Sequence, residues 1–577
     1  MKNFDISSIF NKMADLLEIR GENPFRIRAY RKAAFNIESL GKDISLFSKE
    51  DLMNVPGIGS DLAGKIEEYL ATGKIEAYER LKTQVPESLT ELLGVPGLGP
   101  KTVALIYDRY RVKDIAELAK LAKEHKLLGL PGIKDKTEAN IIKGIEMLQR
   151  ASSRYPLGRA LPVAREITAH LSEHAPVGRL DIAGSIRRWK ETIGDIDIIS
   201  TSRDPGAVMN TFTRMQGVRE VLMKGPTKSS VVLKEGIQVD IRVVEEDSYG
   251  AALAYFTGSK AHNIRLREIA VRAGMKLNEY GIFREKDDKK LGGRTEEEIY
   301  EVLGLQYVPP ELREDTGEVE AAAEYSLPRL LEPSDIRGDL HVHSDWSDGN
   351  MKLGELADVP LSMGYRYIAV TDHSKGLGVA RGLNEERIME QRKAIAALNR
   401  KLRGTRLLAG VEINIRSDGS LDFDEDVMKG FDIVVASVHS GFKQSGVRIT
   451  ERIVKAMRNP YVSIIGHPSG RLIGERDAYE VDMEKVIETA AETGTAIEIN
   501  AYPLRLDLAE PYIRRARAKG VSLAIGTDSH NRGQFGNMAF GVSLARRGWL
   551  EKKDVLNTRD LKPLLATLSA KRRKKSS

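Results

Sequence analysis

Hydrophobic and polar positions alternate with different periods in successive stretches of the chain. In residues 1–150 apolar side chains recur every three or four positions, which indicates amphipathic helices. From about 150 to 245, short runs such as DIDIIS and IQVDIRVV predict strands between helical segments, and 246–315 is a small mixed region. After residue 335, strand-like and helical runs alternate to about 570, which is typical of a parallel β/α barrel. A chain of 577 residues with these changes of pattern is expected to form several domains.

An internal repeat marks the helical first stretch. The segments NVPGIGSDLAGKI (54–66), GVPGLGPKTVALI (94–106) and GLPGIKDKTEANI (129–141) each place a Pro-Gly turn before an amphipathic helix. Such a turn exposes backbone N–H groups at a helix start, where one phosphate can bind, although three ordinary helix turns would give the same pattern. A phosphate contact reads no base, so the predicted binding of nucleic acid is sequence-independent. The candidate contacts are Gly57, Gly59, Gly97, Gly99 and Lys101.

Two acidic residues stand out in the strand-rich stretch. Asp195 and Asp197 in GDIDII are two positions apart, so both carboxylates leave the same face of a strand. Asp240 in QVDIRVV could complete a triad from a neighbouring strand. Oxygen-only triads hold magnesium, and a pair of such ions suits in-line phosphoryl displacement. A solvated strand edge is the alternative explanation for the acidic pair on its own.

The residues around this pair resemble a known family. GSIRR before the pair is similar to the phosphate-binding loop of the nucleotidyltransferase superfamily, and YFTGS (255–259) resembles the segment with which family X DNA polymerases close on the incoming nucleotide. The resemblance runs from residue 1 to about 315 and includes ENPFRIRAYRKAA (22–34). It implies Asp195, Asp197 and Asp240 as catalytic, Mg²⁺-binding residues. The nucleotide-binding residues that it implies are Gly184, Ser185, Arg188, Tyr255, Phe256, Gly258, Lys260 and Asn263.

Two positions depart from the family pattern. Lys65 in LAGKIEEYL matches a lysine that can form a Schiff base with an abasic sugar, and Tyr30 matches its neighbourhood. A second basic position of that pattern is Asp61 here, which puts the lyase activity in doubt. Gln238 stands where an arginine commonly precedes the third catalytic carboxylate.

Histidines dominate the candidate chemistry of the last stretch. The six histidines after residue 335 each follow an apolar run, and Glu412 likewise ends LLAGVE. Parallel strands of a β/α barrel bring their carboxyl ends to one rim, so ligands that occur once per strand converge there. The chain has no cysteine, so any metal there must bind nitrogen and oxygen ligands.

These motifs resemble the PHP (polymerase and histidinol phosphatase) domain, a metal-dependent phosphoesterase fold, over about 336–570. The resemblance implies Mn²⁺ or Zn²⁺, at up to three positions. The implied ligands are His341, His343, Glu412 and Asp528 for the first ion, Glu412, His439 and His467 for the second, and Asp348, His373 and His530 for the third. Asp348 stands where many members have histidine, and Arg471 and Lys443 are candidate phosphate contacts.

The expected fold is therefore multidomain, with an α-helical helix-hairpin-helix region, an α/β nucleotidyltransferase palm with a small thumb, and a distorted β/α barrel. The expected domains are 1–80 (lyase-like helix-hairpin-helix), 81–149 (helical fingers), 150–245 (palm), 246–315 (thumb), 316–335 (flexible linker), 336–570 (PHP) and 571–577 (basic tail).

Charge and composition are compatible with this reading. The net charge of +6 suits a nucleic-acid partner, and no run of eighteen apolar residues or signal-peptide layout occurs. We expect a cytoplasmic, nucleoid-associated monomer of bacterial type that fills short gaps in DNA from dNTPs on gapped or primer-template DNA. We expect the barrel to be a 3′-5′ exonuclease, with AP endonuclease or 3′-phosphatase activity as further possibilities. The alternatives are a small-molecule phosphatase and an inactive metal-stabilised scaffold.

Overall fold

A computed structural model describes residues 2–38, 44–55, 57–86, 88–93, 95, 98–135, 137–139, 141–142, 144–145 and 154–574. The chain forms two compact units, which are described separately. One unit comprises Met1–Arg154, Ile199–Tyr255 and Lys260–Leu303, and the other comprises Tyr155–Ile198, Phe256–Ser259 and Gly304–Ser577.

The first stretch is helical, as its hydrophobic period predicts. Its helices are α1 (Lys2–Ile19), α2 (Pro24–Glu38), α3 (Lys49–Met53), α4 (Ser60–Thr72), α5 (Glu76–Gln84), α6 (Leu89–Leu92), α7 (Pro100–Tyr110) and α8 (Ile115–Lys123). Helix α1 packs against α2, α4, α5, α6 and α7, and its Phe10 ring meets Tyr30 edge to face at 5.5 Å. Helices α4 and α7 each begin after an extended glycine, Gly59 and Gly99, so the repeat has the expected turn-helix form.

A five-stranded sheet follows, in the order β2-β4-β7-β6-β5. Its strands are β2 (Leu180–Ile182), β4 (Asp195–Ser200), β5 (Val218–Lys224), β6 (Lys228–Leu233) and β7 (Gln238–Val243), with helices α10 (Leu157–His174), α11 (Gly184–Arg187) and α12 (Pro205–Thr213). The pairs β5–β6 and β6–β7 are antiparallel.

A smaller group of elements comes next in the chain. It contains α13 (Tyr249–Thr257), α14 (Lys260–Arg272), the antiparallel strands β8 (Met275–Asn278), β9 (Gly281–Arg284) and β10 (Lys290–Gly292), and α15 (Glu296–Val302).

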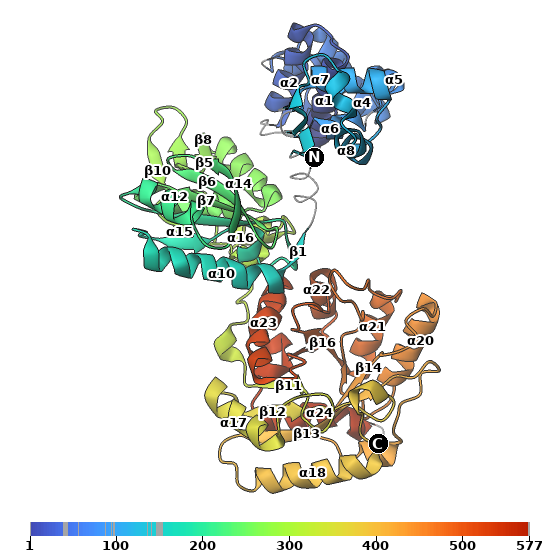
Figure 1. Cartoon of the computed structure of the whole chain (residues 1–577). Helices are drawn as coiled ribbons and strands as arrows, with labels where there is room; N and C mark the ends of the chain where they lie inside the picture. The colour runs from blue at the N-terminus through green and yellow to red at the C-terminus, as the bar shows by residue number, and fades with distance from the viewer. Residues whose placement is uncertain are drawn as a thin grey trace. The chain divides into compact units, whose positions relative to one another are not determined.

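Seven parallel strands form the barrel, which Figure 1 shows in yellow to red. They are β11 (Gly338–Val342), β12 (Tyr367–Val370), β13 (Arg406–Asn414), β14 (Ile433–Ser437), β15 (Ile464–Ile465), β16 (Ala496–Asn500) and β17 (Leu523–Gly526). A parallel bridge between Val342 and Ser529 closes the barrel, and the N–H of Asp528 donates to the carbonyl of His341 at 2.9 Å. Most strands are buried on both faces, which is why they read as continuous apolar runs.

Helices cover the outside of the barrel and one helix closes an end of it. The outer helices are α17 (Leu353–Met363), α18 (Glu385–Asn399), α20 (Gly446–Met457), α21 (Met483–Thr493), α22 (Glu510–Ala518) and α23 (Met538–Arg547). The last helix, α24 (Leu561–Lys574), contributes Leu564 and Leu568 to the core inside the strands.

One prediction made for a connecting segment was wrong. Residues 316–335 are not a flexible joint, because α16 (Glu318–Ala323) and the buried Leu330 and Leu331 pack there, and the N–H of Leu331 donates to the carbonyl of Leu550 at 2.9 Å. The first residues of the expected basic tail belong to helix α24, which extends to Lys574, and Lys571 Nζ donates to the carbonyl of Val462 at 3.0 Å. Within the part of the chain that the structure describes, no helix is long and apolar enough to span a membrane.

Candidate functional site

The predicted ligands of the last stretch meet at the carboxyl ends of the barrel strands. Their ligand atoms form three groups in which all atoms lie within 4.8 Å of one another. The groups are His343, Asp348, His373 and His530; His341, His343 and Asp528; and His373, Glu412 and His439.

Glu412 lies at the centre of this cluster. Its Oε1 is 3.0 Å from Nε2 of His467 and 3.2 Å from Nε2 of His439. Its Oε2 is 2.8 Å from Nδ1 of His373 and 3.5 Å from Nε2 of His341. Burial opposes ionisation of this carboxyl, but His439, His373 and His341 outweigh it and hold the pKa of Glu412 well below its usual range. One carboxylate therefore faces two sets of imidazoles, the position expected of a bridging ligand.

Asp348 and Asp528 supply the other two carboxylates. Asp348 Oδ2 is 3.5 Å from Nε2 of His373, and its Oδ1 is 3.4 Å from Nε2 of His530. Burial raises the pKa of Asp348, but contacts with His373 and His530 outweigh it and lower that pKa. Asp528 Oδ1 is 3.1 Å from Nε2 of His343, and its backbone has the left-handed φ of 54°, which is uncommon outside glycine.

The grouping differs in detail from the expected ligand sets. His343 lies with the expected third set as well as the first, and His373 lies with Glu412 and His439. His467 enters no group of three among the described residues but is adjacent to Glu412.

The donor set fits divalent cations. Several buried imidazole nitrogens make no well-aligned hydrogen bond, although His373 Nδ1 and His343 Nε2 lie near carboxylate oxygens: His341 Nε2, both ring nitrogens of His343, His373 Nδ1 and His467 Nδ1. A buried polar nitrogen left unpaired is costly, so such a cluster around carboxylates is expected to coordinate metal.

Sequence reasoning missed the residues that orient these ligands. Glu498 Oε1 on β16 accepts a hydrogen bond of 2.6 Å from Nδ1 of His341, and Asn414 Oδ1 lies 2.6 Å from Nδ1 of His439. Arg505 Nε lies 3.5 Å from Asp528 Oδ2. One of these residues, Glu498, could have been found from the sequence, because it is an acid within the apolar strand AIEIN. A buried glutamate is expected to have a partner.

The three residues of the predicted acidic triad lie on two strands. Asp195 and Asp197 are on β4, exposed and half-buried, and Asp240 is on β7. The side-chain amide of Gln238 donates to Asp240 Oδ1 at 3.1 Å, from the position where the family pattern has arginine. Gly184, with φ of 63°, lies so close to Asp197 that an added Cβ would be 2.5 Å from its Oδ2.

The predicted nucleotide-binding residues lie on several elements. Arg188 follows α11 and donates from Nη1 to the carbonyl of Thr257, while Ser185 lies within α11. Tyr255 is exposed on α13, and its carbonyl accepts a hydrogen bond of 2.7 Å from the Asn263 amide. The remaining members, Phe256, Gly258 and Lys260, lie at the end of α13, between the two helices, and at the start of α14.

The glycines of the repeat are exposed where the structure describes them. An added Cβ at Gly59 or Gly99 would meet nothing within 4 Å, so the turn surface is open, and Lys101 is exposed beside it. Gly57 has φ of 88°, and Gly97 lies outside the described residues.

The candidate lyase residues have structural contacts. The ammonium group of Lys65 pairs with Asp61, one turn earlier on α4. Tyr30 is 1% exposed in the helical core.

Arg471 is committed to contacts inside the protein. Its guanidinium pairs with Glu191 at 2.7 Å and donates to the carbonyl of Arg505 at 2.9 Å. It therefore does not present a free charge to a phosphate, whereas Lys443 is exposed.

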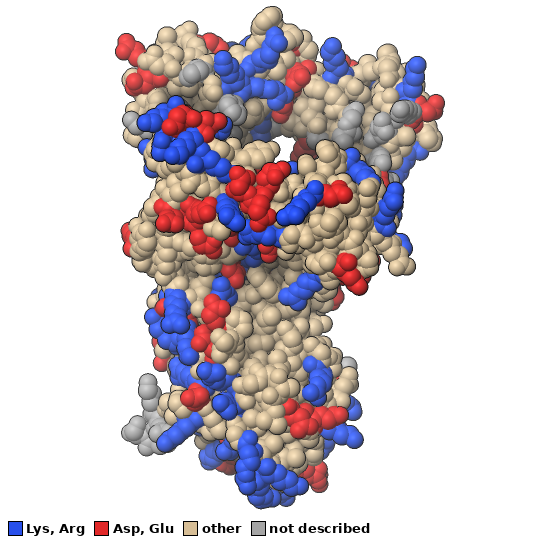
Figure 2. Space-filling view, turned by 90° about the vertical axis from the view of Figure 1, so that its left-hand side faces the viewer, with Lys and Arg blue, Asp and Glu red and all other residues tan. Residues whose placement is uncertain are grey.

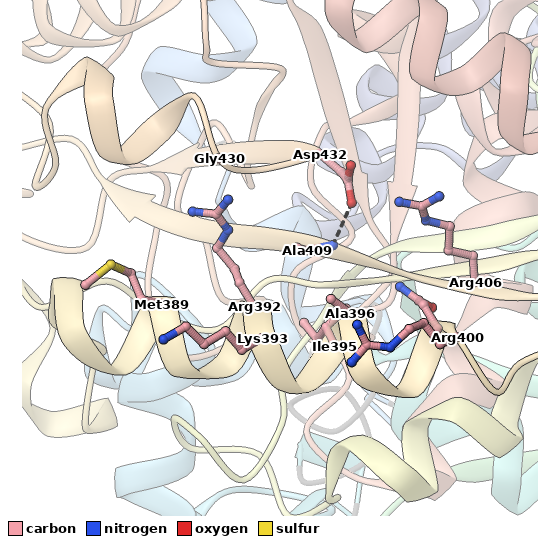
Figure 3. Close-up of a pocket in the computed structure, with 11 residues that line it drawn as sticks. Met389, Arg392, Lys393, Ile395, Ala396, Arg400, Arg406, Ala409, Gly430 and Asp432 are labelled. Carbon is pink, nitrogen blue, oxygen red and sulfur yellow. Dashed lines mark hydrogen bonds between the residues drawn. The ribbon is translucent and has the colours of Figure 1, made fainter.

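A basic hollow of about 600 Å³ lies outside the barrel between α18 and β13 (Figure 3). Its charged lining is Arg392, Lys393, Arg400, Arg406 and Asp432. Arg406 begins β13 and Glu412 follows six residues later, which is about 20 Å along a strand. The hollow is therefore separate from the ligand cluster. Basic side chains also gather at the lower end of Figure 2, the end at which Figure 1 places α18.

Models of known protein families match four parts of the chain. They are a helix-hairpin-helix domain (residues 1–75), a SAM-like helix-hairpin-helix tandem (89–147), the DNA polymerase beta thumb (252–314) and the PHP domain (339–502).

Similar proteins cover both halves of the chain. DNA polymerase/3′-5′ exonuclease PolX of Bacillus subtilis (strain 168) is 41% identical over 570 residues, which is 98% of this chain and 99% of that protein. A probable phosphatase of Thermoanaerobacter sp. (strain X514) is 32% identical over 248 residues, 41% of this chain and 96% of its own. DNA polymerase lambda of Rattus norvegicus is 26% identical over 344 residues, 54% of this chain and 56% of its own.

Proposed function

This chain belongs to the family X DNA polymerases that carry a C-terminal PHP domain, and from that premise we propose that it both extends and shortens DNA 3′ ends. The first half fills short gaps in DNA during repair, and the barrel acts as a 3′-5′ exonuclease. The observation that carries the proposal is the pairing, in one chain, of a β4–β7 acidic motif and a rim of imidazoles around Glu412.

For nucleotide addition, Asp195, Asp197 and Asp240 hold Mg²⁺, and Gln238 orients Asp240 through its amide. Divalent cations held by these carboxylates would supply positive charge opposite the triphosphate and the attacking 3′-hydroxyl. Gly184 leaves room beside Asp197, and Arg188 contacts the triphosphate. The other residues proposed to contact the dNTP are Ser185, Tyr255, Phe256, Gly258, Lys260 and Asn263.

For DNA shortening, the rim residues hold Mn²⁺ or Zn²⁺. Cations held there would supply Lewis acidity for the attack of water on phosphorus and positive charge opposite the departing oxygen. Glu498 and Asn414 fix the imidazoles of His341 and His439, so that their Nε2 atoms face the carboxylates. Asp348 supplies a hard oxygen, which favours manganese over softer ions at that position.

The glycine turns of the helical region hold the sugar-phosphate backbone of gapped or primer-template DNA without reading bases. We propose that the domains have the limits predicted from the sequence, with one change. Residues 316–335 belong to the same compact unit as the barrel and are not a separate linker. We also propose that the protein is a monomer and acts at the bacterial nucleoid, where its DNA substrate is.

A phosphatase is the second candidate for the barrel. The 32% identity to probable phosphatases spans almost the full length of those proteins and covers this part of the chain. Removal of a 3′-phosphate from DNA would be consistent with the similarity to phosphatases. It would also prepare a 3′ end that the polymerase half of the chain can extend.

Two variants of the full chain test the proposal. Asp197→Asn is expected to abolish addition of dNTPs to a gapped primer and to retain Mn²⁺-dependent shortening of end-labelled DNA. His343→Ala is expected to do the reverse. Loss of both activities in either variant contradicts two separate centres. A 3′-phosphorylated primer and a small phosphate ester, assayed beside plain DNA, distinguish the exonuclease from the two phosphatase readings.

A further inference from the structure

The predicted phosphate-binding loop is fastened to the barrel. The loop, residues 184–191, and helix α23 belong to the same compact unit. Arg547, the last residue of α23, is 3% exposed, and its Nη1 donates to the carbonyl of Arg188 at 2.6 Å. Its Nη2 pairs with Glu510 on α22, so the guanidinium is anchored in the barrel on one side and reaches the loop on the other.

Glu314 joins the two arginines. Its Oε1 lies 3.0 Å from Arg188 Nε and 3.2 Å from Arg547 Nη1. Burial opposes the charge of Glu314, but Arg188 and Arg547, with Lys190, outweigh it and lower the pKa of this carboxyl. An ionised carboxylate that is shared in this way fixes the direction of both guanidinium groups.

The geometry leaves one end of Arg188 available. Its Nε binds Glu314 and its Nη1 binds the carbonyl of Thr257. Among the described contacts, Nη2 of Arg188 has no partner. A guanidinium held at two of its nitrogens presents the third in a fixed direction, which suits a phosphate oxygen.

The loop has a second attachment to the barrel. The Trp189 ring meets Phe540 of α23 edge to face at 5.5 Å. Glu191 pairs with Arg471, which also donates to the carbonyl of Arg505. The second half of the loop is therefore held at Arg188, Trp189 and Glu191 by residues that follow it by hundreds of positions in the sequence.

We propose that Arg547, a barrel residue, is a positioning residue for nucleotide addition. It holds Glu314 and the carbonyl of Arg188 so that Arg188 Nη2 points toward the triphosphate of the incoming dNTP. The inference rests on the proposed polymerase function and on Arg188 as a phosphate contact. It makes the barrel a structural part of the nucleotide site, in addition to carrying its own chemistry.

Steady-state kinetics of the full chain test this role. Arg547→Ala is expected to raise KM for dNTP about tenfold or more, because a charge-assisted contact of Arg188 is misdirected. The same variant is expected to lower kcat much less and to leave DNA shortening within about twofold, while Arg547→Lys restores part of the KM. Arg546→Ala is the matched control, because the neighbouring Arg546 pairs with Glu311 and Glu332 instead of with the loop.

A double-mutant cycle separates the possible outcomes. If Arg547 acts through Arg188, Arg547→Ala adds little to the KM of Arg188→Ala. Unchanged KM in Arg547→Ala, or additive effects, overturns the proposal, and so does loss of DNA shortening in parallel with synthesis, which marks a folding defect. A wild-type chain that adds no nucleotide would instead refute the polymerase function itself.

Discussion

The carboxylate of Glu498 holds the imidazole of His341: Oε1 and Nδ1 are 2.6 Å apart, and both side chains are at most 2% exposed. This contact turns Nε2 of His341 toward Glu412 and Asp528, at 3.5 and 3.9 Å. Glu498 also accepts the backbone N–H of His467 at 2.6 Å. Glu498, which is not itself one of the clustered ligand residues, thus orders two candidate ligands, His341 on β11 and His467 just after β15.

Glu498→Gln is expected to weaken metal binding at the barrel rim without unfolding the barrel. The amide keeps the size of the side chain but loses the charge that orients His341, and loss of such a partner typically costs about 10- to 100-fold in metal affinity or activity. We expect less manganese in the dialysed protein and slower DNA shortening, with dNTP addition retained. Glu488→Gln, which alters an exposed pair with Lys519 on the barrel surface, is the control. Equal metal content in Glu498→Gln and wild type would contradict the role of Glu498.

Gly184→Ala tests the close approach of the loop to the acidic pair. An added Cβ would be 2.5 Å from Asp197 Oδ2, so the carboxylate must move. A displacement of about 1 Å can cost about a hundredfold in rate, and we expect a loss of that order in dNTP addition with DNA shortening unchanged.

Gly274→Ala separates this clash from backbone strain. Gly274 has nearly the same left-handed φ, 67°, but an added Cβ there would meet nothing within 4 Å. We expect it to retain synthesis. If both variants lose synthesis equally, strain rather than the contact with Asp197 is responsible.

The sequence predicted the histidine cluster because each of its ligand residues follows its own strand. Each histidine of the rim follows its own apolar run, and the parallel topology brings those ends together whatever the loops between them do. His373 and His439 come from strands β12 and β14 and still meet at Glu412. The helix-hairpin-helix turns could also be predicted, because a Pro-Gly turn depends only on residues that are adjacent in the sequence.

Sequence reasoning failed where a contact depends on elements far apart in the chain. The pairing of Glu498 with His341 joins residues 157 positions apart, and that of Arg547 with Glu314 joins residues 233 apart. The linker prediction failed for a related reason. Charged and alanine-rich residues suggested a flexible joint, but Leu330 and Leu331 are buried, and the N–H of Leu331 donates to the carbonyl of Leu550.

A half-buried lysine at the barrel base makes the stability of the fold pH-dependent. Lys571 Nζ donates to the carbonyl of Val462 at 3.0 Å and to Thr495 Oγ1 at 2.7 Å, and burial lowers its pKa from 10.5 to about 7. Between about pH 7 and 10.5 the unfolded chain therefore holds a proton that the folded chain has released. The free energy of unfolding rises with pH across this window, and the cost of burying the charge is fully present below pH 7.

Thermal melting of Lys571→Met and wild type checks this sign. We expect the Tm of Lys571→Met minus that of wild type to be most positive near pH 6. This difference is expected to decrease as the pH approaches 10, because wild type gains stability over that range. Lys562→Met, which removes an exposed lysine from the same helix, is expected to show no such trend. A difference between Lys571→Met and wild type that is constant with pH would mean that Lys571 keeps its proton in the folded protein.

Lys101→Ala tests the phosphate grip of the helical region. Lys101 is exposed in the first turn of α7, directly after the open turn at Gly99. If it contacts one phosphate, its removal weakens binding of gapped DNA whatever the sequence, and the slope of log K against log salt concentration falls by about 1. Fluorescence anisotropy across a salt series measures both quantities.

Lys126→Ala is the control for this prediction. It removes a lysine that is already paired with Glu124 at 2.7 Å, so we expect a smaller change in slope. Weaker binding of Lys101→Ala with an unchanged slope would show that Lys101 supports the turn and does not touch the backbone of DNA.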